Sequence, residues 1–263
     1  MKCIRACPTD AMYRHHERIE IDLNKCIYCG KCMEVCERHG LKTENSHMST
    51  TLSNYDYTVA LLPGSFFADF TSEKEAGRMM NAIKNLGFDE VLDYSDVEGA
   101  IYLETIQIAE KSQNLKIASF CPCINTLIQK HFPMLVEKLV PLDYPVEVAA
   151  RQVRQRLDGQ YEKIGIYSIC DCVAKRLLAK EPYGNMDSAI DHVMSLSHIF
   201  PKANRAKNEQ SLPNHLCREG ISSVVSDFYH YYQGERPLLS VSGLDSCMKA
   251  LELAEFGHLD EIG

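Results

Sequence analysis

Cysteines at the spacing C-x2-C-x2-C-x3-C begin at Cys26 and end at Cys36. A shorter run upstream contains Cys3 and Cys7, and Pro8 follows it directly. Three thiolates in even steps on a tight loop can hold a cubane from one side, while a fourth thiolate arrives from another segment. Zinc sites use two separated pairs instead, so the spacing favours a 4Fe–4S cluster over zinc or over a group of reduced, buried thiols.

The two cysteine runs also indicate how ligands are shared. In two-cluster bacterial ferredoxins the last cysteine of each run binds the cluster of the other run. That rule assigns one complete 4Fe–4S ligand set, which consists of Cys7, Cys26, Cys29 and Cys32. Cys3 and Cys36 are then ligands of a second cluster, whose other two cysteines would lie before residue 1. Either the amino-terminal end of this motif is missing or one cluster has been lost; we expect a missing start, because Cys36 would otherwise have no partner.

The composition is typical of an intracellular redox protein. The chain has 263 residues and a net charge of −8, which argues against a nucleic-acid partner. Its 12 cysteines cluster at metal-type spacings and do not form a scattered disulfide framework. The start has no apolar signal segment, and no apolar run is long enough to span a bilayer. We therefore expect a cytoplasmic protein with no membrane partner, working in an anaerobe or at low oxygen.

Strand-like and helix-like segments alternate beyond a polar stretch at residues 43–54, which we interpret as a linker. The expected strands are residues 18–26, 58–63, 90–95, 115–120 and 163–170. The expected helices are residues 73–88, 99–113, 124–140 and 146–157. This order predicts an α/β fold with largely parallel sheets covered by helices, preceded by a small cysteine-rich module.

Two of the expected strands end in a C-x-C motif. The strand at residues 115–120 leads into Cys121 and Cys123, and the strand at residues 163–170 leads into Cys170 and Cys172. Open α/β sheets bind ligands at the carboxyl ends of their strands, so Cys121 and Cys172 are expected to converge. A buried cysteine otherwise behaves as a small hydrophobic residue, which is the alternative for both motifs.

The order of several segments resembles the iron-only hydrogenase large subunit, preceded by a ferredoxin-like domain. The resemblance is carried by LGFDEVLDYS, by SFCPCINTLIQKHFPMLVEKLV, by SICDCVAK and by the tail VSGLDSCMKALELAEFGHLDEIG. It implies a ferredoxin-like 4Fe–4S domain of α+β type at residues 1–45. A hydrogenase-like α/β domain of two lobes is implied at residues 55–263. The family's third cysteine segment is expected after the tail, so this domain is also expected to be incomplete at its carboxyl end.

The resemblance also implies roles for individual residues. Cys121 and Cys172 match two ligands of a third 4Fe–4S cluster, whose other two ligands have no counterpart here. Phe120 stands where hydrogenases have the thiol that passes protons to a dinuclear iron centre, and Cys170 stands where they have a methionine. Lys175 matches a lysine that contacts cyanide ligands of that centre. Its alternative is a solvated lysine at a helix start.

These departures favour a protein that does not turn over hydrogen, because phenylalanine carries no transferable proton. We expect an iron–sulfur electron-transfer or redox-sensing protein with a redox partner protein and a fused or separate signalling output domain. The alternatives are a fragment of a catalytic hydrogenase and a factor that assembles iron–sulfur clusters. Among the remaining cysteines, Cys123 and Cys170 are candidate alternative ligands, whereas Cys217 and Cys247 are expected to be packing residues.

Overall fold

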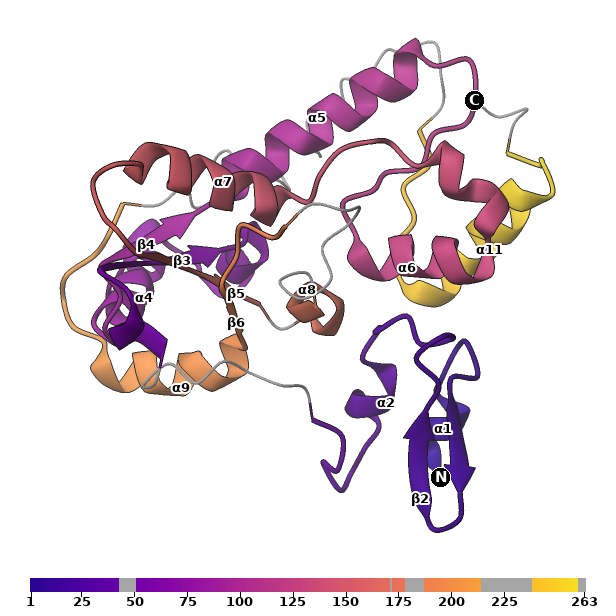
Figure 1. The fold of residues 1–263 in the computed structure, drawn as a ribbon, viewed down its shortest axis with the longest axis horizontal. Coiled ribbons are helices and arrows are strands. Elements are labelled where there is room, and N and C mark those ends of the chain that lie inside the picture. The colour runs from indigo at the N-terminus through magenta and orange to yellow at the C-terminus, as the bar shows by residue number, and fades with distance from the viewer. Residues whose placement is uncertain (43–50, 171, 178–186, 214–237, 260–263) are drawn as a thin grey trace.

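A parallel sheet of four strands organises the larger part of the protein (Figure 1). The computed structural model describes residues 1–42, 51–170, 172–177, 187–213 and 238–259. The strands are β3 (Tyr57–Leu62), β4 (Glu90–Asp93), β5 (Ile164–Ile169) and β6 (His192–Met194), in the order β4-β3-β5-β6. The chain leaves β3 toward β4 and later returns to pair β5 on the other side of β3. This reversal of direction opens a crevice at the carboxyl ends of the strands.

Helices cover both faces of the sheet, because successive strand side chains point to opposite faces and both sets are apolar (Figure 1). One face packs against α4 (Glu73–Lys84) and α9 (Leu196–Ala206). The other face packs against α7 (Pro145–Leu157), which lies beside α5 (Ser95–Lys111). The α/β architecture predicted from the alternating segments is therefore present.

A separate apolar core lies between α6 (Pro122–His131), η3 (Pro133–Lys138) and α11 (Leu244–Glu255). We predicted one continuous helix over residues 124–140, and this prediction is wrong. The helix ends at His131 because Pro133 has no backbone N–H to donate and restricts the residue before it. Ile27 of the amino-terminal unit is fully enclosed in this core, so the two parts of the chain share it.

The amino-terminal unit is a short antiparallel hairpin with two single-turn helices. It consists of α1 (Lys2–Arg5), β1 (Met12–His15), β2 (Arg18–Ile21) and α2 (Lys31–Glu34). The hairpin pairs Met12 with Ile21 and His15 with Arg18. Only the first half of the expected strand at residues 18–26 thus forms a strand. The loop that follows it carries the second cysteine run.

The expected strand at residues 115–120 does not join the sheet. Its only β contact within the described part of the chain is an isolated parallel bridge between Ile117 and Leu139. Ile117 packs instead against the core of α6, η3 and α11, so its apolar side chain is partly buried there and not in the sheet. Cys121 therefore does not lie at the end of a sheet strand.

The short elements β1, β6 and α9 were not anticipated from the sequence. Residues 43–50 of the expected linker lie outside the described residues.

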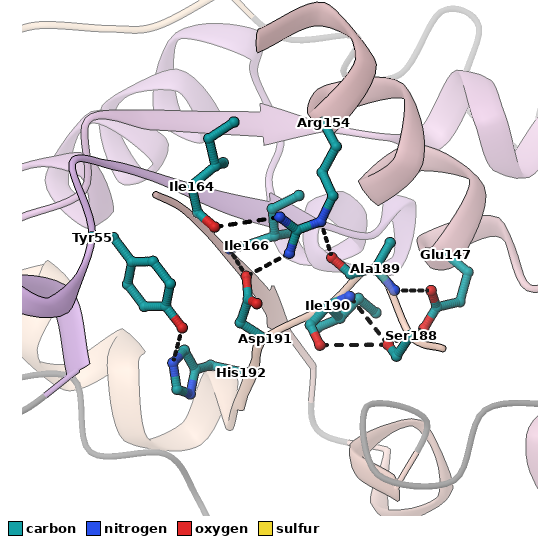
Figure 2. A network of polar contacts seen from close by, with 10 residues as sticks. All are labelled: Tyr55, Glu147, Arg154, Ile164, Ile166, Ser188, Ala189, Ile190, Asp191 and His192. Carbon is teal, nitrogen blue, oxygen red and sulfur yellow. Dashed lines mark hydrogen bonds and ion pairs between the residues drawn. The ribbon is translucent and has the colours of Figure 1, made fainter. Parts of the chain in front are cut away.

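Polar contacts from α7 fasten the segment that leads into β6 (Figure 2). The guanidinium of Arg154 donates to the Ala189 carbonyl at 2.9 Å and to an Asp191 carboxylate oxygen at 2.8 Å. The buried carboxylate of Glu147 accepts hydrogen bonds from the Ala189 N–H and the Ser188 hydroxyl. These contacts fix the sheet edge at which the chain returns from α8 (Val173–Leu177).

Candidate metal centre

A cavity of about 260 Å³ in the amino-terminal unit is lined by thiols from both cysteine runs. The thiols are those of Cys7, Cys26, Cys29 and Cys32. Cys7 lies just after α1, whereas the other three come from the loop before α2 and from α2 itself. These are the four residues that the spacing assigns to one cluster, and the fold brings them to one place. Their role as metal ligands stays a prediction.

The loop between Cys26 and Cys32 wraps around the cavity through two residues with positive φ. Tyr28 has φ 56° and Gly30 has φ 80°, both in the left-handed region. Gly30 then serves as the N-cap of α2, which places Cys32 in the first turn of that helix. Glycine adopts this backbone conformation without a steric cost, so the sequence C-x-x-C-G-x-C suits a tight turn around a ligand.

The surroundings of the cavity disfavour the negatively charged thiolate form of its cysteines. Burial raises the pKa of both Cys29 and Cys32, and the neighbouring thiolate charges raise it further. The backbone N–H of Lys31 partly offsets this rise at Cys29, and the N–H of Ala11 donates to Cys7 Sγ at 3.2 Å. Four thiolates at this site therefore require positive charge among them, which iron ions would supply.

The arrangement fits a cluster of several irons. In a cubane each thiolate binds a different iron, so its four sulfur ligands surround a volume and do not meet at a point. Here too, thiols from two segments of the chain surround one cavity.

Cys3 and Cys36 lie in segments that meet on the same unit. Lys2 forms an ion pair with Glu37, which brings the neighbours of both cysteines together. Hydrogen bonds from backbone N–H groups, first that of Gly40, hold the pKa of Cys36 below its usual value. Such donors stabilise a thiolate, the form that binds iron. The assignment of Cys3 and Cys36 to a second cluster remains a prediction.

The two C-x-C motifs lie close enough to interact. Cys121 is the N-cap of α6 and Cys123 lies in its first turn, while Cys172 directly precedes α8. Burial raises the pKa of Cys121, and the charge of Cys172 raises it further. Burial is also the main cause of a strongly raised pKa at Cys123, to which the charges of Cys121, Cys29 and Cys172 add. Cys123 thus lies between the amino-terminal loop and a second cysteine group, which consists of Cys121 and Cys172.

Two further cysteines border this second group. Cys170 directly follows β5; burial raises its pKa to about 11, which Lys175 and Arg176 partly offset. Cys247 lies on α11, and its pKa is raised by burial and then by the charge of Cys121. We expected Cys247 to be a packing residue, and its position beside Cys121 is not apparent from its isolated place in the sequence. Cys217 lies outside the described residues.

A second cavity, of about 140 Å³, opens at the carboxyl ends of the strands. Phe120 and Lys175 line it together, as do Tyr94, Tyr102 and Tyr144. Glu98 lies in its wall, only 9% exposed, where it accepts a hydrogen bond from the Gly64 N–H at 2.8 Å. Its other carboxylate oxygen is 4.0 Å from Lys175 Nζ. Lys175 thus borders the cavity with Glu98 as a charged neighbour, and its role stays a prediction; no sequence motif marks Glu98 as its partner.

The amino-terminal unit docks onto the same elements that carry the second cysteine group. Lys130 at the end of α6 donates to the carbonyls of Leu23 and Cys26, at 2.7 and 2.8 Å. Lys31 pairs with Asp245 at the start of α11, at 2.6 Å. Near α8, a Cβ on Gly30 would come within 3.0 Å of Val173, so loop and helix are in direct contact. The sequence offered no signal for these contacts.

Comparisons with known proteins find two family models and a similar solved structure. The family model described as "Iron only hydrogenase large subunit, C-terminal domain" matches residues 58–209, and a model for a 4Fe–4S dicluster domain matches residues 1–37. A solved structure described as "[FeFe]-hydrogenase Oxygen Inactivation is Initiated by the Modification and Degradation of the H cluster 2Fe Subcluster" is similar at 17% identity and a TM-score of 0.46. The likeness covers 76% of this chain and 52% of that one, so this chain spans about half the length of that hydrogenase. No curated protein matches.

No helix among the described residues is long and apolar enough to cross a membrane. A 4Fe–4S domain followed by a hydrogenase-like domain fits an iron–sulfur electron-transfer role. The matched hydrogenase segment covers more than half of the 263 residues. The chain therefore belongs to the family of the iron-only hydrogenase large subunit, C-terminal domain.

Proposed function

We propose that this chain is an electron-transfer or redox-sensing protein whose hydrogenase-like domain works without a dinuclear iron centre. The observation that carries the proposal is the convergence of Cys7, Cys26, Cys29 and Cys32 on one cavity. A 4Fe–4S cluster bound there supplies one-electron transfer. The protein's own contribution is to hold four partly buried thiolates and to donate backbone N–H groups to sulfur.

The absence of hydrogen chemistry is supported by the second cavity. Phe120 occupies the position that the resemblance assigns to the proton-passing thiol, and its ring packs on Tyr102 with centroids 4.8 Å apart. An aromatic ring can neither accept nor release a proton at this place. The carboxylate of Glu98, in the wall of this cavity, accepts a hydrogen bond from the Gly64 N–H and faces Lys175. An anionic ligand entering here would meet a carboxylate of like charge.

The donor or acceptor would be a redox partner protein, and a sensing role would add an output domain, fused or separate. The second cysteine group, with Cys121 and Cys172 beside the amino-terminal unit, supplies a further place where an electron could be held. The interaction of Cys123 with both cysteine groups supports a short path between them.

The test is anaerobic reconstitution of the whole chain, together with Cys29→Ser and Met33→Leu. Both residues line the cavity, but only cysteine is a cubane ligand. We expect about four iron atoms per assembled cluster and a paramagnetic signal after reduction. Cys29→Ser should lose the amino-terminal cluster, whereas Met33→Leu should retain it.

The same samples, after treatment with hydrogenase maturation proteins, decide between electron transfer and catalysis. We expect no hydrogen evolution from a reduced dye and no infrared bands of metal-bound cyanide. Hydrogen turnover would instead identify a catalytic hydrogenase fragment. Transfer of the cluster to an apo-acceptor within minutes would favour an assembly factor, and wild-type iron content in Cys29→Ser would overturn the ligand assignment.

A further inference from the structure

The thiol-lined cavity has one wall that does not belong to the amino-terminal unit. Val173, Arg176 and Leu177, all on α8, line it opposite the cysteine loop. The contact is direct, because a Cβ on Gly30 would lie 3.0 Å from Val173 Cγ2. Figure 1 shows α8 between the sheet and the amino-terminal unit. The helix begins one residue after Cys172, so it connects the second cysteine group to the first cavity.

Arg176 brings a permanent positive charge to that wall. Apart from Lys42, the other residues that line the cavity are neutral, and many are apolar, such as Met12, Ile27 and Leu177. Arg176 Nε is buried, so its charge is less screened than that of a surface residue.

We propose that Arg176 sets the reduction potential of the amino-terminal iron–sulfur site from within the hydrogenase-like domain. This inference rests on the proposed function, because it requires that the four thiols hold a cluster. Reduction takes one electron from the redox partner protein and adds one negative charge to the cavity. A guanidinium in the wall stabilises that added charge and so favours the reduced form.

The position of Arg176 links the two cysteine groups through the short helix α8, which directly follows Cys172. Any change in the loop before α8, where Cys172 lies, would move Arg176 relative to the first cavity. The hydrogenase-like domain would thereby influence the potential of a site to which it contributes no thiol. This role differs from ligation, so it survives substitution of Arg176 by another cation.

The experiment is a redox titration of the whole protein, following the paramagnetic signal that is lost in Cys29→Ser. Arg176→Gln removes the charge, Arg176→Lys retains it, and Arg205→Gln removes an exposed arginine on α9 outside the cavity. In Arg176→Gln we expect the reduced-to-oxidised ratio at fixed potential to fall about tenfold, equivalent to about 59 mV for one electron. Arg176→Lys and Arg205→Gln should stay close to the wild type.

An unchanged potential in Arg176→Gln, or an equal shift in Arg176→Lys, would overturn the proposal. Should Arg176→Gln fail to fold, Leu177→Lys provides the second test, since it adds a cation to the same wall and should shift the potential upward. No shift in Leu177→Lys would count against the proposal as well. A wild-type protein that binds no iron would contradict the proposed function itself, and iron analysis before the titration separates the two outcomes.

Discussion

His192 illustrates how burial at a single residue affects stability. Its ring stacks on Tyr167 with centroids 4.7 Å apart, and its Nε2 is 2.9 Å from the Tyr55 hydroxyl. Burial lowers the pKa of His192, although Asp191 partly opposes this effect. The neutral ring can accept a hydrogen bond from the tyrosine hydroxyl, whereas the protonated ring cannot. The folded protein therefore favours neutral His192.

This shift predicts a loss of stability in mild acid. Because the folded-state pKa lies below that of the unfolded chain, the unfolded chain binds the proton first as pH falls below about 6.5. The stabilisation is present above that pH and declines as pH falls through the folded-state pKa. In His192→Gln we expect a smaller drop in the thermal unfolding midpoint between pH 7.5 and 5.5 than in the wild type. His198→Gln, an exposed histidine on α9, is the control. An undiminished drop in His192→Gln would contradict the prediction.

Among the elements, α7 contributes more than an apolar face. Its Glu147 is only 2% exposed and accepts hydrogen bonds from the Ser188 hydroxyl and the Ala189 N–H (Figure 2). A buried carboxylate costs free energy unless such donors satisfy it. These bonds hold the segment that enters β6, and β6 in turn pairs with the strand that leads to Cys170.

Removal of this carboxylate should therefore weaken the sheet edge. We expect Glu147→Ala to lower the free energy of unfolding by about 1–3 kcal/mol, because the Ala189 N–H loses its acceptor in a buried place. Denaturant unfolding followed by circular dichroism measures the change. Glu162→Ala, at an exposed position near the same end of the sheet, should remain within about 0.5 kcal/mol of the wild type. Equal effects of both substitutions would show that the bonds to Glu147 contribute nothing specific.

At the scale of the whole molecule, the amino-terminal unit and the hydrogenase-like part share a core and a set of polar contacts. Ile27 is enclosed between α6, η3 and α11. Lys130 binds two carbonyls of the cysteine loop and lies 5.3 Å from the centre of the Tyr28 ring. Residues of the hydrogenase-like part also line the cavity of the thiols, so its stability depends on docking.

Weaker docking should expose the metal site. In Lys130→Ala we expect loss of visible absorbance in the presence of a chelator to become roughly fivefold faster, the effect of about 1 kcal/mol in the opening equilibrium. Both hydrogen bonds are exposed to solvent, which keeps the effect small. Lys249→Ala, an exposed lysine on α11, is the matched control and should bleach at the wild-type rate. Equal bleaching rates in Lys130→Ala and wild type would show that docking does not protect the site.

The sequence by itself determined the features that depend on neighbours along the chain. The spacing from Cys26 to Cys36 predicts a cluster loop, because chelation by a short loop is a local property. The apolar runs of β3 and β5 predict buried parallel strands, and the helix that ends before Gly87 follows its own start and stop signals.

Only the tertiary structure decided which distant residues meet. The run at residues 115–120 has the composition of a strand, yet Ile117 finds its apolar partners beside α6 and leaves the sheet. Glu98, Arg176 and Lys130 carry no motif, and each gains its role from a segment far away in the chain. Burial, charge pairing and docking depend on these long-range contacts, which local patterns do not encode.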